Sequence, residues 1–174
     1  TLLASSAASD VYKRQMKYYY DYRFPIGNLT IEEDGHGICG IYFGIKKLEG
    51  EKKNTELIRE AALQLSQYFD GRRKKFDLKL SYYGTEFQIK VWKALQEIPY
   101  GTTCTYKDIA ERVGIPKGCR AVGMANNKNP IVIVVPCHRV IGMNGSLTGY
   151  AGGLDVKEYL LELEKRNQKV KERY

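Results

Sequence analysis

A cysteine, a histidine and an arginine stand side by side at Cys137, His138 and Arg139. They directly follow Pro136 and a run of five β-branched residues, 131–135. Such a run is typical of a buried strand, so we expect a strand that fixes the position of the thiol. The thiolate is the nucleophilic form of cysteine, and neighbouring cationic groups favour it. The segment therefore indicates a nucleophilic thiol at the end of a buried strand.

A histidine that activates a nucleophile needs a third group to orient its ring. Neighbouring side chains of an extended segment point to opposite faces, so a direct hydrogen bond between His138 and Cys137 is not guaranteed and a water molecule could connect them. Glu164 lies in a segment with helical spacing, 153–169, and would orient the imidazole if that helix packs behind the strand. Against this interpretation, a buried cysteine is more commonly an inert small hydrophobic residue.

The overall composition predicts a folded chain with an anionic partner. The chain has 174 residues, of which 43% are hydrophobic and 28% charged, so a sizeable core forms in one domain or two small ones. No apolar run approaches the ~20 residues that span a bilayer. The net charge of +8 favours nucleic acid as the partner and, second, an acidic membrane surface.

The cysteines do not have the spacing of a metal site. None of the four forms a C-x-x-C pair, and His36 and His138 are the only histidines, so we expect no zinc cage of the usual kind. A chain of this size folds without disulfides, and nothing secretory accompanies the cysteines. We therefore expect reduced thiols and a cytoplasmic protein, associated with the nucleoid if the source is prokaryotic.

The first half of the chain predicts a small α/β domain over residues 16–80. Residues 17–45 are rich in aromatic and β-branched residues and contain a turn at Asp34-Gly35, which predicts strands. A helix is expected over 54–71, capped by Asn54 or Thr55. Residues 1–15 differ in character from the rest of the chain, and we interpret them as a leader or an artefact outside the fold.

The second half, 81–174, predicts a mostly helical domain, so the fold class is α+β. Helical spacing or capping residues mark four segments, 85–98, 106–113, 117–128 and 153–169. The second and third have the shape of a helix-turn-helix. From Arg112 to Leu154 there is no Asp or Glu, and such a stretch tolerates the close approach of phosphates. Two packed core helices on a solvated basic face would give the same pattern.

Four ordered segments together resemble a known family. They read "IPYGTTCTYKDIA", "RAVGMANNKNP", "IVVPCHRVIG" and "GYAGGLDVKEYLLELE". In this order they resemble the O6-alkylguanine-DNA alkyltransferases, also called methylated-DNA–protein-cysteine methyltransferases. The resemblance extends from Met16 to about Lys165. It implies a ribonuclease-H-like N-terminal domain, followed by a C-terminal domain that carries the helix-turn-helix and the reactive cysteine.

The resemblance implies a role for each residue of the reaction. Cys137 matches the cysteine that accepts the alkyl group. His138 matches the histidine that activates it through a water molecule, and Glu164 matches the acid that orients this histidine. Tyr106 matches the tyrosine that assists departure of the guanine. The product would be a thioether, so each molecule would react once and be consumed.

Further matches concern the DNA and the base pocket. Arg120 matches the arginine that fills the gap left by the flipped nucleotide. Asn129 matches a hinge between the helix-turn-helix and the active-site strand. Tyr150 and Ala151 match the loop that closes over the base, although some family members have serine where this chain has Ala151. The backbone of Val140 matches a contact to the exocyclic amine of the base.

The implied partner is double-stranded DNA that contains O6-alkylguanine, bound through its minor groove. We expect Arg120 and Lys117 to approach the DNA, with Gly123 and Ala125 small enough to allow close contact. O4-alkylthymine is a further substrate that the resemblance leaves open. We expect a monomer that needs no cofactor and no metal and has no membrane partner.

Two other functions remain alternatives on the residues alone. The chain could be a helix-turn-helix regulator in which Cys137 is structural or senses alkylation. It could also be a Cys-His hydrolase or acyltransferase, which would need an oxyanion hole and would turn over repeatedly. Stoichiometric appearance of an alkyl group on Cys137 separates alkyl transfer from both.

Overall fold

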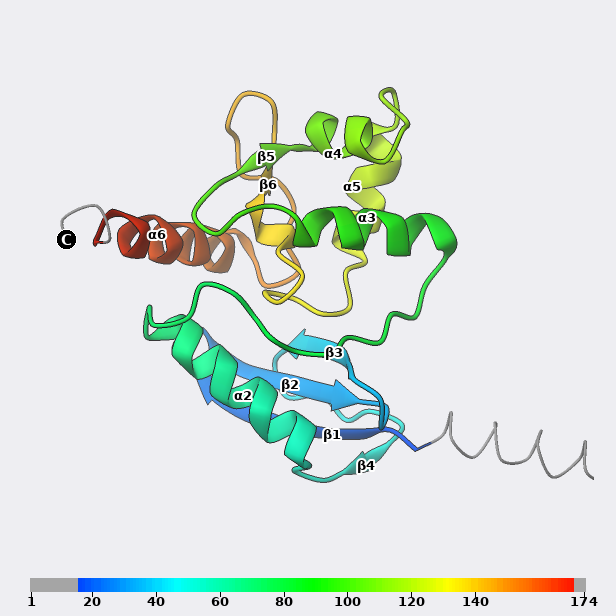
Figure 1. Ribbon diagram of the computed structural model, residues 1–174, viewed down its shortest axis with the longest axis vertical. Coiled ribbons are helices and arrows are strands. Elements are labelled where there is room, and N and C mark those ends of the chain that lie inside the picture. The colour runs from blue at the N-terminus through cyan, green and yellow to red at the C-terminus, as the bar shows by residue number, and fades with distance from the viewer. Residues whose placement is uncertain (1–15, 171–174) are drawn as a thin grey trace, which may run out of the picture.

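The computed structural model describes residues 16–170, and the strands expected between residues 17 and 45 form one sheet (Figure 1). Its strands are β1 (Tyr18–Phe24), β2 (Gly27–Glu33), β3 (Ile38–Phe43) and the short β4 (Glu51–Lys52). The order is β3-β2-β1-β4; β1, β2 and β3 are antiparallel neighbours, and β4 pairs in parallel with β1. Asp34 stabilises the β2–β3 hairpin by accepting the backbone N–H groups of His36 and Gly37.

Helix α2 (Glu56–Phe69) covers one face of this sheet (Figure 1). It begins after Thr55, whose side chain accepts the backbone N–H of Ile58, as the sequence predicts for one of its two candidate caps. Ile58, Leu65 and Tyr68 are completely buried because they share the helical face that is turned to the interior.

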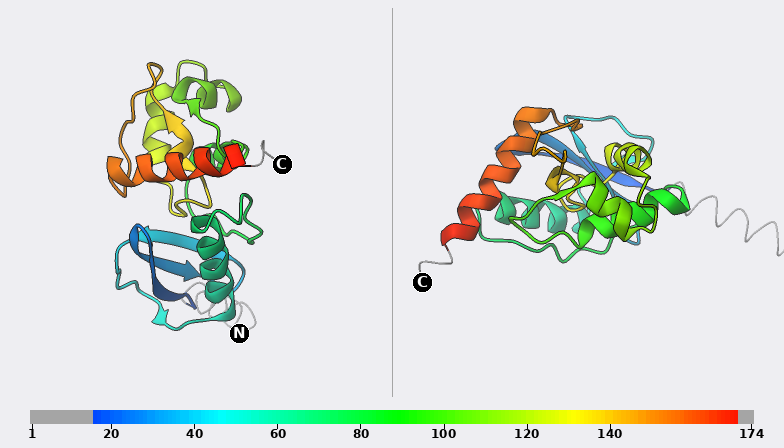
Figure 2. Two further views of the ribbon diagram at one scale, coloured as in Figure 1. Left: turned by 90° about the vertical axis from the view of Figure 1, so that its left-hand side faces the viewer. Right: turned by 90° about the horizontal axis from the view of Figure 1, so that it is seen from above.

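The C-terminal unit is mostly helical and lies on the other side of the molecule from α2 and the sheet (Figure 2). Its elements are α3 (Glu86–Gln96), β5 (Cys104–Thr105), α4 (Tyr106–Arg112), α5 (Cys119–Asn127), the 3₁₀ turn η1 (Cys137–Arg139), β6 (Val140–Ile141) and α6 (Leu154–Val170). Capping boxes at Thr85 and Thr105 fix the starts of α3 and α4. The two-residue strands β5 and β6 pair in parallel and were not predicted.

The predicted strand over 131–135 is wrong. The run forms isolated bridges and a turn, with Ile133 at a φ of 72°, which no regular strand contains. Asn129 holds the loop together: its Oδ1 accepts the N–H of Ile131 at 3.0 Å, and its Nδ2 donates to the carbonyl of Val135 at 2.8 Å. The aliphatic side chains are nevertheless buried, so the hydrophobic run reports a core position without fixing the backbone conformation.

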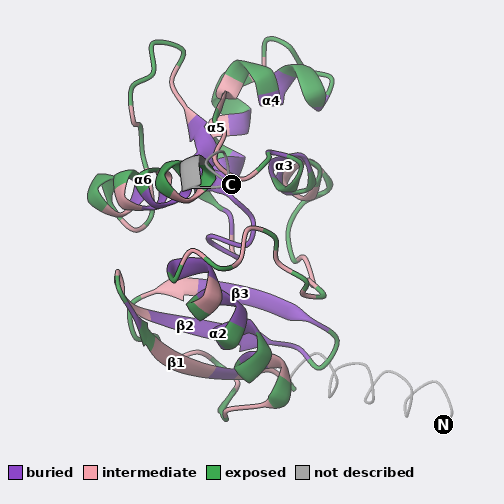
Figure 3. Cartoon of the chain, turned by 60° about the vertical axis from the view of Figure 1, so that its left-hand side comes forward, coloured by how far each residue is buried: buried purple, intermediate pink, exposed green. Residues whose placement is uncertain are grey.

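This loop also joins the two units. Backbone hydrogen bonds connect Ile41 of β3 to Pro130 at 2.8 Å and Val132 back to Ile41 at 3.3 Å. The rings of Phe43 and Tyr150 meet edge to face with centroids 5.5 Å apart. Buried residues accordingly continue from the sheet into the C-terminal unit (Figure 3).

Two further sequence predictions concern the leader and membrane-spanning segments. The proposed leader, 1–15, lies outside the described residues. Within residues 16–170, no helix combines the length and the apolar character that a bilayer-spanning segment requires.

Candidate active site

Cys137 opens the 3₁₀ turn η1 instead of ending a strand. Pro136 precedes the turn and has no N–H to continue a ladder, while the N–H of Cys137 bonds to the carbonyl of Val135 at 2.8 Å. The thiol is buried, with only 4% of the residue exposed. The segment therefore forms a tight turn instead of the extended structure expected from the sequence. In this turn the neighbouring side chains of Cys137, His138 and Arg139 point in different directions.

His138 and Glu164 form a direct hydrogen-bonded pair in the interior. Nε2 of His138 lies 2.7 Å from Oε2 of Glu164, and both residues are completely buried. Glu164 comes from α6, which therefore packs behind the thiol segment as the sequence required. The other ring nitrogen, Nδ1 of His138, is buried and has no hydrogen-bond partner among the described residues.

Arg139 is directed to the same carboxylate and not to the thiol. Its Nε donates to Oε1 of Glu164 at 2.8 Å and its Nη2 to Oε2 at 3.1 Å, which is the bidentate geometry that carboxylates favour. Its Nη1 donates to the carbonyl of Ile98 at 2.7 Å. Arg139 therefore orients Glu164, and its charge is compensated there.

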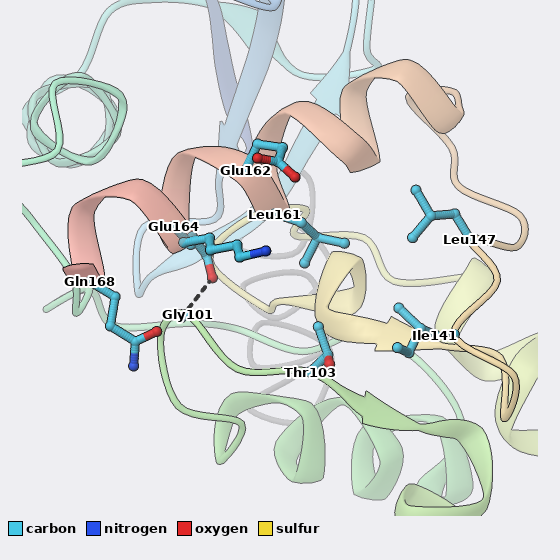
Figure 4. A pocket seen from close by; sticks show the side chains of 10 residues that line it. Gly101, Thr103, Ile141, Leu147, Leu161, Glu162, Glu164 and Gln168 are labelled. Atoms are coloured by element: carbon cyan, nitrogen blue, oxygen red, sulfur yellow. Dashed lines mark hydrogen bonds between the residues drawn. The ribbon is translucent and has the colours of Figure 1, made fainter.

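Two further donors complete the surroundings of Glu164. The hydroxyl of Tyr68, from α2 of the N-terminal unit, donates to Oε2 at 2.6 Å. The backbone N–H of Gly101 donates to Oε1 at 3.1 Å, and Figure 4 shows this bond between α6 and the loop before β5. No local pattern indicated a role for Tyr68, because its partner is 96 positions away. Both units thus contribute to the orientation of one carboxylate.

Burial and charge fix the protonation states of this pair. Burial alone would raise the pKa of the Glu164 carboxyl, but hydrogen bonds from His138 and Arg139 and the positive charge of Arg139 outweigh it and hold that pKa well below its usual range. Burial lowers the pKa of His138, aided by the charges of Arg139 and Lys157 against the opposing effect of Glu164. At neutral pH the site therefore holds an ionised Glu164 and a neutral His138, which can accept a proton.

The resting thiol is protonated. Burial raises the pKa of Cys137 to about 11, and a hydrogen bond from Asn129 and the charge of Lys157 offset only part of this effect. The expectation that a neighbouring Arg139 favours the thiolate is wrong, because its guanidinium is bound to Glu164. A base must remove the proton during the reaction, and His138 is the neutral base next in the chain.

A loop and two tyrosines lie around the thiol segment. The hydroxyl of Tyr106, at the start of α4, lies 2.9 Å from Oγ1 of Thr148. The hydroxyl of Tyr150 is buried without a partner among the described residues; burial, followed by the charges of Cys137 and Glu164, raises its pKa well above the usual value. Ala151 is exposed next to it, whereas Val140 is fully buried. An unpartnered buried hydroxyl beside the thiol is a polar group available to a ligand.

The face of the predicted helix-turn-helix is only partly as expected. Arg120 and Lys117 are exposed, and Gly123 is half-buried near the ring of Tyr106. Ala125 is not on this face, which corrects its prediction as a DNA contact. The residue is 3% exposed, and its carbonyl accepts the indole N–H of Trp92 at 2.8 Å, because helical periodicity turns it toward α3.

A hollow lies next to Glu164. A cavity of about 570 Å³ separates α6 from the loops before β5 and after β6 (Figure 4). Thr103, Ile141, Leu147 and Leu161 are among its lining residues, and Cys137 is not. Within residues 16–170, no group of three or more His, Cys, Asp or Glu side chains is placed to hold a metal ion.

One buried side chain of the site was missed. Lys157 of α6 is completely buried, and its Nζ donates to the carbonyls of Val140 at 2.6 Å and Thr148 at 2.9 Å. It lies seven residues before Glu164 and so on the same helical face, which is the signal that could have identified it.

Comparison with known proteins places nearly all of the described chain in one family. The family models described as "6-O-methylguanine DNA methyltransferase, ribonuclease-like domain" and "DNA binding domain" match residues 17–82 and 86–166, respectively. The methylated-DNA--protein-cysteine methyltransferase of Methanosarcina acetivorans is 55% identical over 152 residues, which cover 84% of this chain and 97% of the relative. The constitutive enzyme of the same name from Bacillus subtilis is 46% identical, over 90% of this chain and all of the relative.

Solved structures agree in fold. A crystal structure of Mycobacterium tuberculosis OGT in complex with DNA superimposes with a TM-score of 0.81 at 44% identity, covering 86% of this chain and 94% of that one. The α+β fold with a ribonuclease-like unit and a DNA-binding unit, which the sequence predicts, is therefore confirmed. On these matches, and on a buried thiol beside a His–Glu pair, the chain belongs to the 6-O-methylguanine DNA methyltransferase family.

Proposed function

We propose that this protein repairs O6-alkylguanine in double-stranded DNA by moving the alkyl group irreversibly onto Cys137. The observation that carries the proposal is a buried thiol in the turn that also places His138 against Glu164 at 2.7 Å. Relatives that are 46–55% identical over most of the chain are named methylated-DNA--protein-cysteine methyltransferases, which supports the same activity.

The residues divide the reaction between them. His138 takes the thiol proton through Nδ1, directly or across one water molecule, while Glu164 holds the ring through Nε2. The sulfur attacks the alkyl carbon, a C–S bond forms, and the bond between that carbon and O6 of guanine breaks. Tyr106 assists departure by hydrogen bonding to the base. The leaving guanine gains one proton, so the net reaction moves a proton from sulfur to base and an alkyl group from base to sulfur.

A thioether explains why the reaction runs once. Water does not readily cleave a C–S bond, so the alkyl group stays on Cys137. Each protein molecule is consumed by one lesion. The enzyme is therefore a stoichiometric transferase.

The base must leave the duplex before the thiol can reach it. Extrusion of a nucleotide costs a few kcal/mol, and a side chain inserted into the vacancy offsets part of this cost. Arg120 is the inserted side chain, since it is exposed near the start of α5. Lys117 binds a phosphate, and the small Gly123 lets α5 approach the minor groove closely. These contacts carry no direct sequence information, as a search for damage requires.

The remaining predicted residues shape the base pocket. Tyr150 and Ala151 close over the extruded base, the backbone of Val140 contacts its exocyclic amine, and Asn129 is the hinge between α5 and the thiol turn. The protein acts as a monomer without a cofactor. A cytoplasmic location fits the free thiols of its four cysteines.

The test is mass mapping after incubation with a duplex that contains one O6-methylguanine. We expect one methyl group per protein molecule, on the peptide with Cys137, and no further product when excess DNA is added. Cys137→Ala should bind the same duplex and transfer nothing. Repeated turnover would indicate a hydrolase, and methylation confined to Cys39, Cys104 or Cys119 would overturn the assignment.

A further inference from the structure

Tyr68 of α2 donates its hydroxyl to the same carboxylate oxygen that His138 uses. The hydroxyl lies 2.6 Å from Oε2 of Glu164, and Nε2 of His138 lies 2.7 Å from that atom. All three residues are completely buried, so bulk water does not compete for the oxygen. Two short hydrogen bonds, one from each unit of the protein, therefore meet at a single atom.

The ring of Tyr68 fixes the position of this hydroxyl. It packs against Phe76 and Tyr100, with ring centroids 5.5 Å and 6.2 Å away. Phe76 belongs to the loop after α2, and Tyr100 belongs to the loop before β5. A ring packed between side chains of both units has little freedom to turn its hydroxyl away from Glu164.

Glu164 does not need this hydroxyl to satisfy its oxygens. Arg139 donates to both oxygens, the N–H of Gly101 donates to Oε1, and His138 donates to Oε2. A carboxylate has about four lone-pair positions, and these donors already fill them. Tyr68 is a fifth donor, at the shortest of the five distances. Its presence therefore points to a role other than satisfying Glu164.

Two donors on one carboxylate oxygen weaken each other. Each donor draws electron density from the oxygen, so Glu164 stabilises an imidazolium at His138 less strongly while Tyr68 donates to it. Tyr68 thus acts in the same direction as burial, which lowers the pKa of His138. A neutral His138 is the form that can accept the thiol proton.

Other groups around this pair do not take the place of Tyr68. The charged or titratable ones are Cys137 and Arg139 of η1, Lys157 of α6, Tyr100 of the loop before β5 and Tyr150 of the loop before α6. The hydroxyl of Tyr100 accepts a hydrogen bond from Asn167 at 3.4 Å, and that of Tyr150 has no partner among the described residues. Within residues 16–170, Tyr68 is therefore the tyrosine that donates to Glu164.

We propose that Tyr68 is a positioning residue of the alkyl-transfer site, which shares Oε2 of Glu164 with His138 and so keeps the imidazole neutral and ready to accept a proton. The N-terminal unit is then part of the proton-transfer apparatus. A C-terminal unit alone would keep Cys137, His138 and Glu164 but would lose this donor. The inference deepens the proposed function and rests on it for its meaning in repair.

The first experiment observes His138 directly in the full-length protein. The chain has two histidines, and the exposed His36 serves as an internal reference in ¹H–¹⁵N spectra of the imidazoles. Tyr68→Phe removes the hydroxyl and keeps the ring. We expect the titration midpoint of His138 to rise and its Nε2 proton to shift downfield, because Glu164 then binds the imidazole more strongly. The midpoint of His36 should stay unchanged.

Two further variants separate the hydroxyl from packing. Tyr22→Phe removes a hydroxyl that donates to Asn54 at 2.7 Å in the same unit, and it should leave His138 unchanged. 3-Fluorotyrosine at position 68 keeps the hydroxyl and makes it a stronger donor, so the Nε2 proton of His138 should shift upfield. This variant tests the proposal even where loss of the hydroxyl destabilises the protein. Shifts in the same direction for both changes at position 68, or an unchanged His138 in both, would overturn the proposal.

The second experiment measures alkyl transfer from free O6-benzylguanine between pH 6 and 8. Tyr68→Phe should lose rate severalfold as the pH falls through this range, because more of His138 is then protonated. The unmodified protein and Tyr22→Phe should lose less, and equal losses in all three would overturn the link from Tyr68 to proton transfer.

The two experiments also separate the inference from the proposed function. The spectra of His138 need no substrate. The expected spectral shifts in a protein that never alkylates Cys137 would refute the proposed function alone. Stoichiometric transfer to Cys137 together with a His138 that does not respond to Tyr68→Phe would refute the inference alone.

Discussion

The surroundings of Glu164 and the outer face of α5 differ in burial and in hydrogen bonding. Glu164 is fully buried and accepts hydrogen bonds from Tyr68 of α2, from Gly101 before β5, and from His138 and Arg139 of η1. Helix α5 begins after Gly118, which provides no side-chain cap, and Arg120 in its first turn is exposed to solvent. One region is complete before any substrate arrives, and the other lacks its partner.

The difference shows where accuracy is needed. A proton acceptor must be neutral and correctly oriented at the moment of reaction, and buried hydrogen bonds achieve this in advance. A damaged base occurs in any sequence context, so the DNA-facing surface gains more from exposed cations that adapt to the backbone. Substitutions should therefore affect folding and chemistry in the first region and DNA-dependent steps in the second.

The largest effect is expected at Glu164. Glu164→Ala leaves Arg139 as a buried cation without its partner, which should lower the free energy of unfolding by about 3–5 kcal/mol. Urea denaturation measures this loss. Glu162→Ala, at an exposed position on the same helix, should change stability by no more than about 0.5 kcal/mol. Similar small losses in both variants would mean that the buried network is not a unit of stability.

A smaller effect, confined to DNA, is expected at Arg120. Arg120→Ala should slow repair of O6-methylguanine in a duplex about ten- to a hundredfold, since a few kcal/mol of extrusion cost is no longer offset. Reaction with free O6-benzylguanine needs no extrusion and should keep its rate. Arg166→Ala, which removes an exposed arginine from α6, serves as the control. Equal losses on both substrates would remove Arg120 from the DNA-facing region.

The pH dependence of stability tests the buried region around Glu164. Burial depresses the pKa of His138 in the folded state, whereas the unfolded value is about 6.5. Below that pH the unfolded chain binds a proton that the folded protein does not bind, so stability should fall as the pH is lowered from 7 to 5. The contribution of Glu164 persists in this window, because it is lost only as pH falls below about 4.

Thermal denaturation at several pH values checks this assignment with a matched pair. His138→Asn should flatten the dependence between pH 7 and 5. His36→Asn should retain it, because His36 is exposed on the β2–β3 hairpin. A slope that follows His36 instead would place the neutral buried base elsewhere.

The smallest effect is expected at Gly123. A methyl group there would meet only the ring of Tyr106 at 3.9 Å, which is ordinary contact, and alanine also favours the helix by about 0.5–1 kcal/mol. Gly123→Ala should therefore preserve or raise stability while weakening binding to undamaged duplex severalfold. Fluorescence anisotropy and thermal denaturation on one sample give both values. Unchanged affinity would show that α5 does not approach DNA closely at this position.

Local patterns in the sequence determined most helices of this protein. Thr85 and Thr105 predict the starts of α3 and α4 because a capping box needs only residues three positions apart. The spacing on α6 placed Glu164 on an inward face, and its contact with His138 follows from packing that face behind the thiol. Such features depend on neighbours within one or two helical turns.

The tertiary structure alone decided the features that depend on distant partners. The run 131–135 is apolar enough for a strand, but its hydrogen bonds with Asn129 and Ile41 hold it as a loop. Arg139 could have faced the thiol, yet Glu164 and Ile98 hold it elsewhere. The protonated state of Cys137 follows from its burial, which outweighs nearby charge. Long-range hydrogen bonds set the backbone conformation of residues 131–135, and burial sets the pKa of Cys137. Neither can be predicted from residues that are adjacent in the sequence.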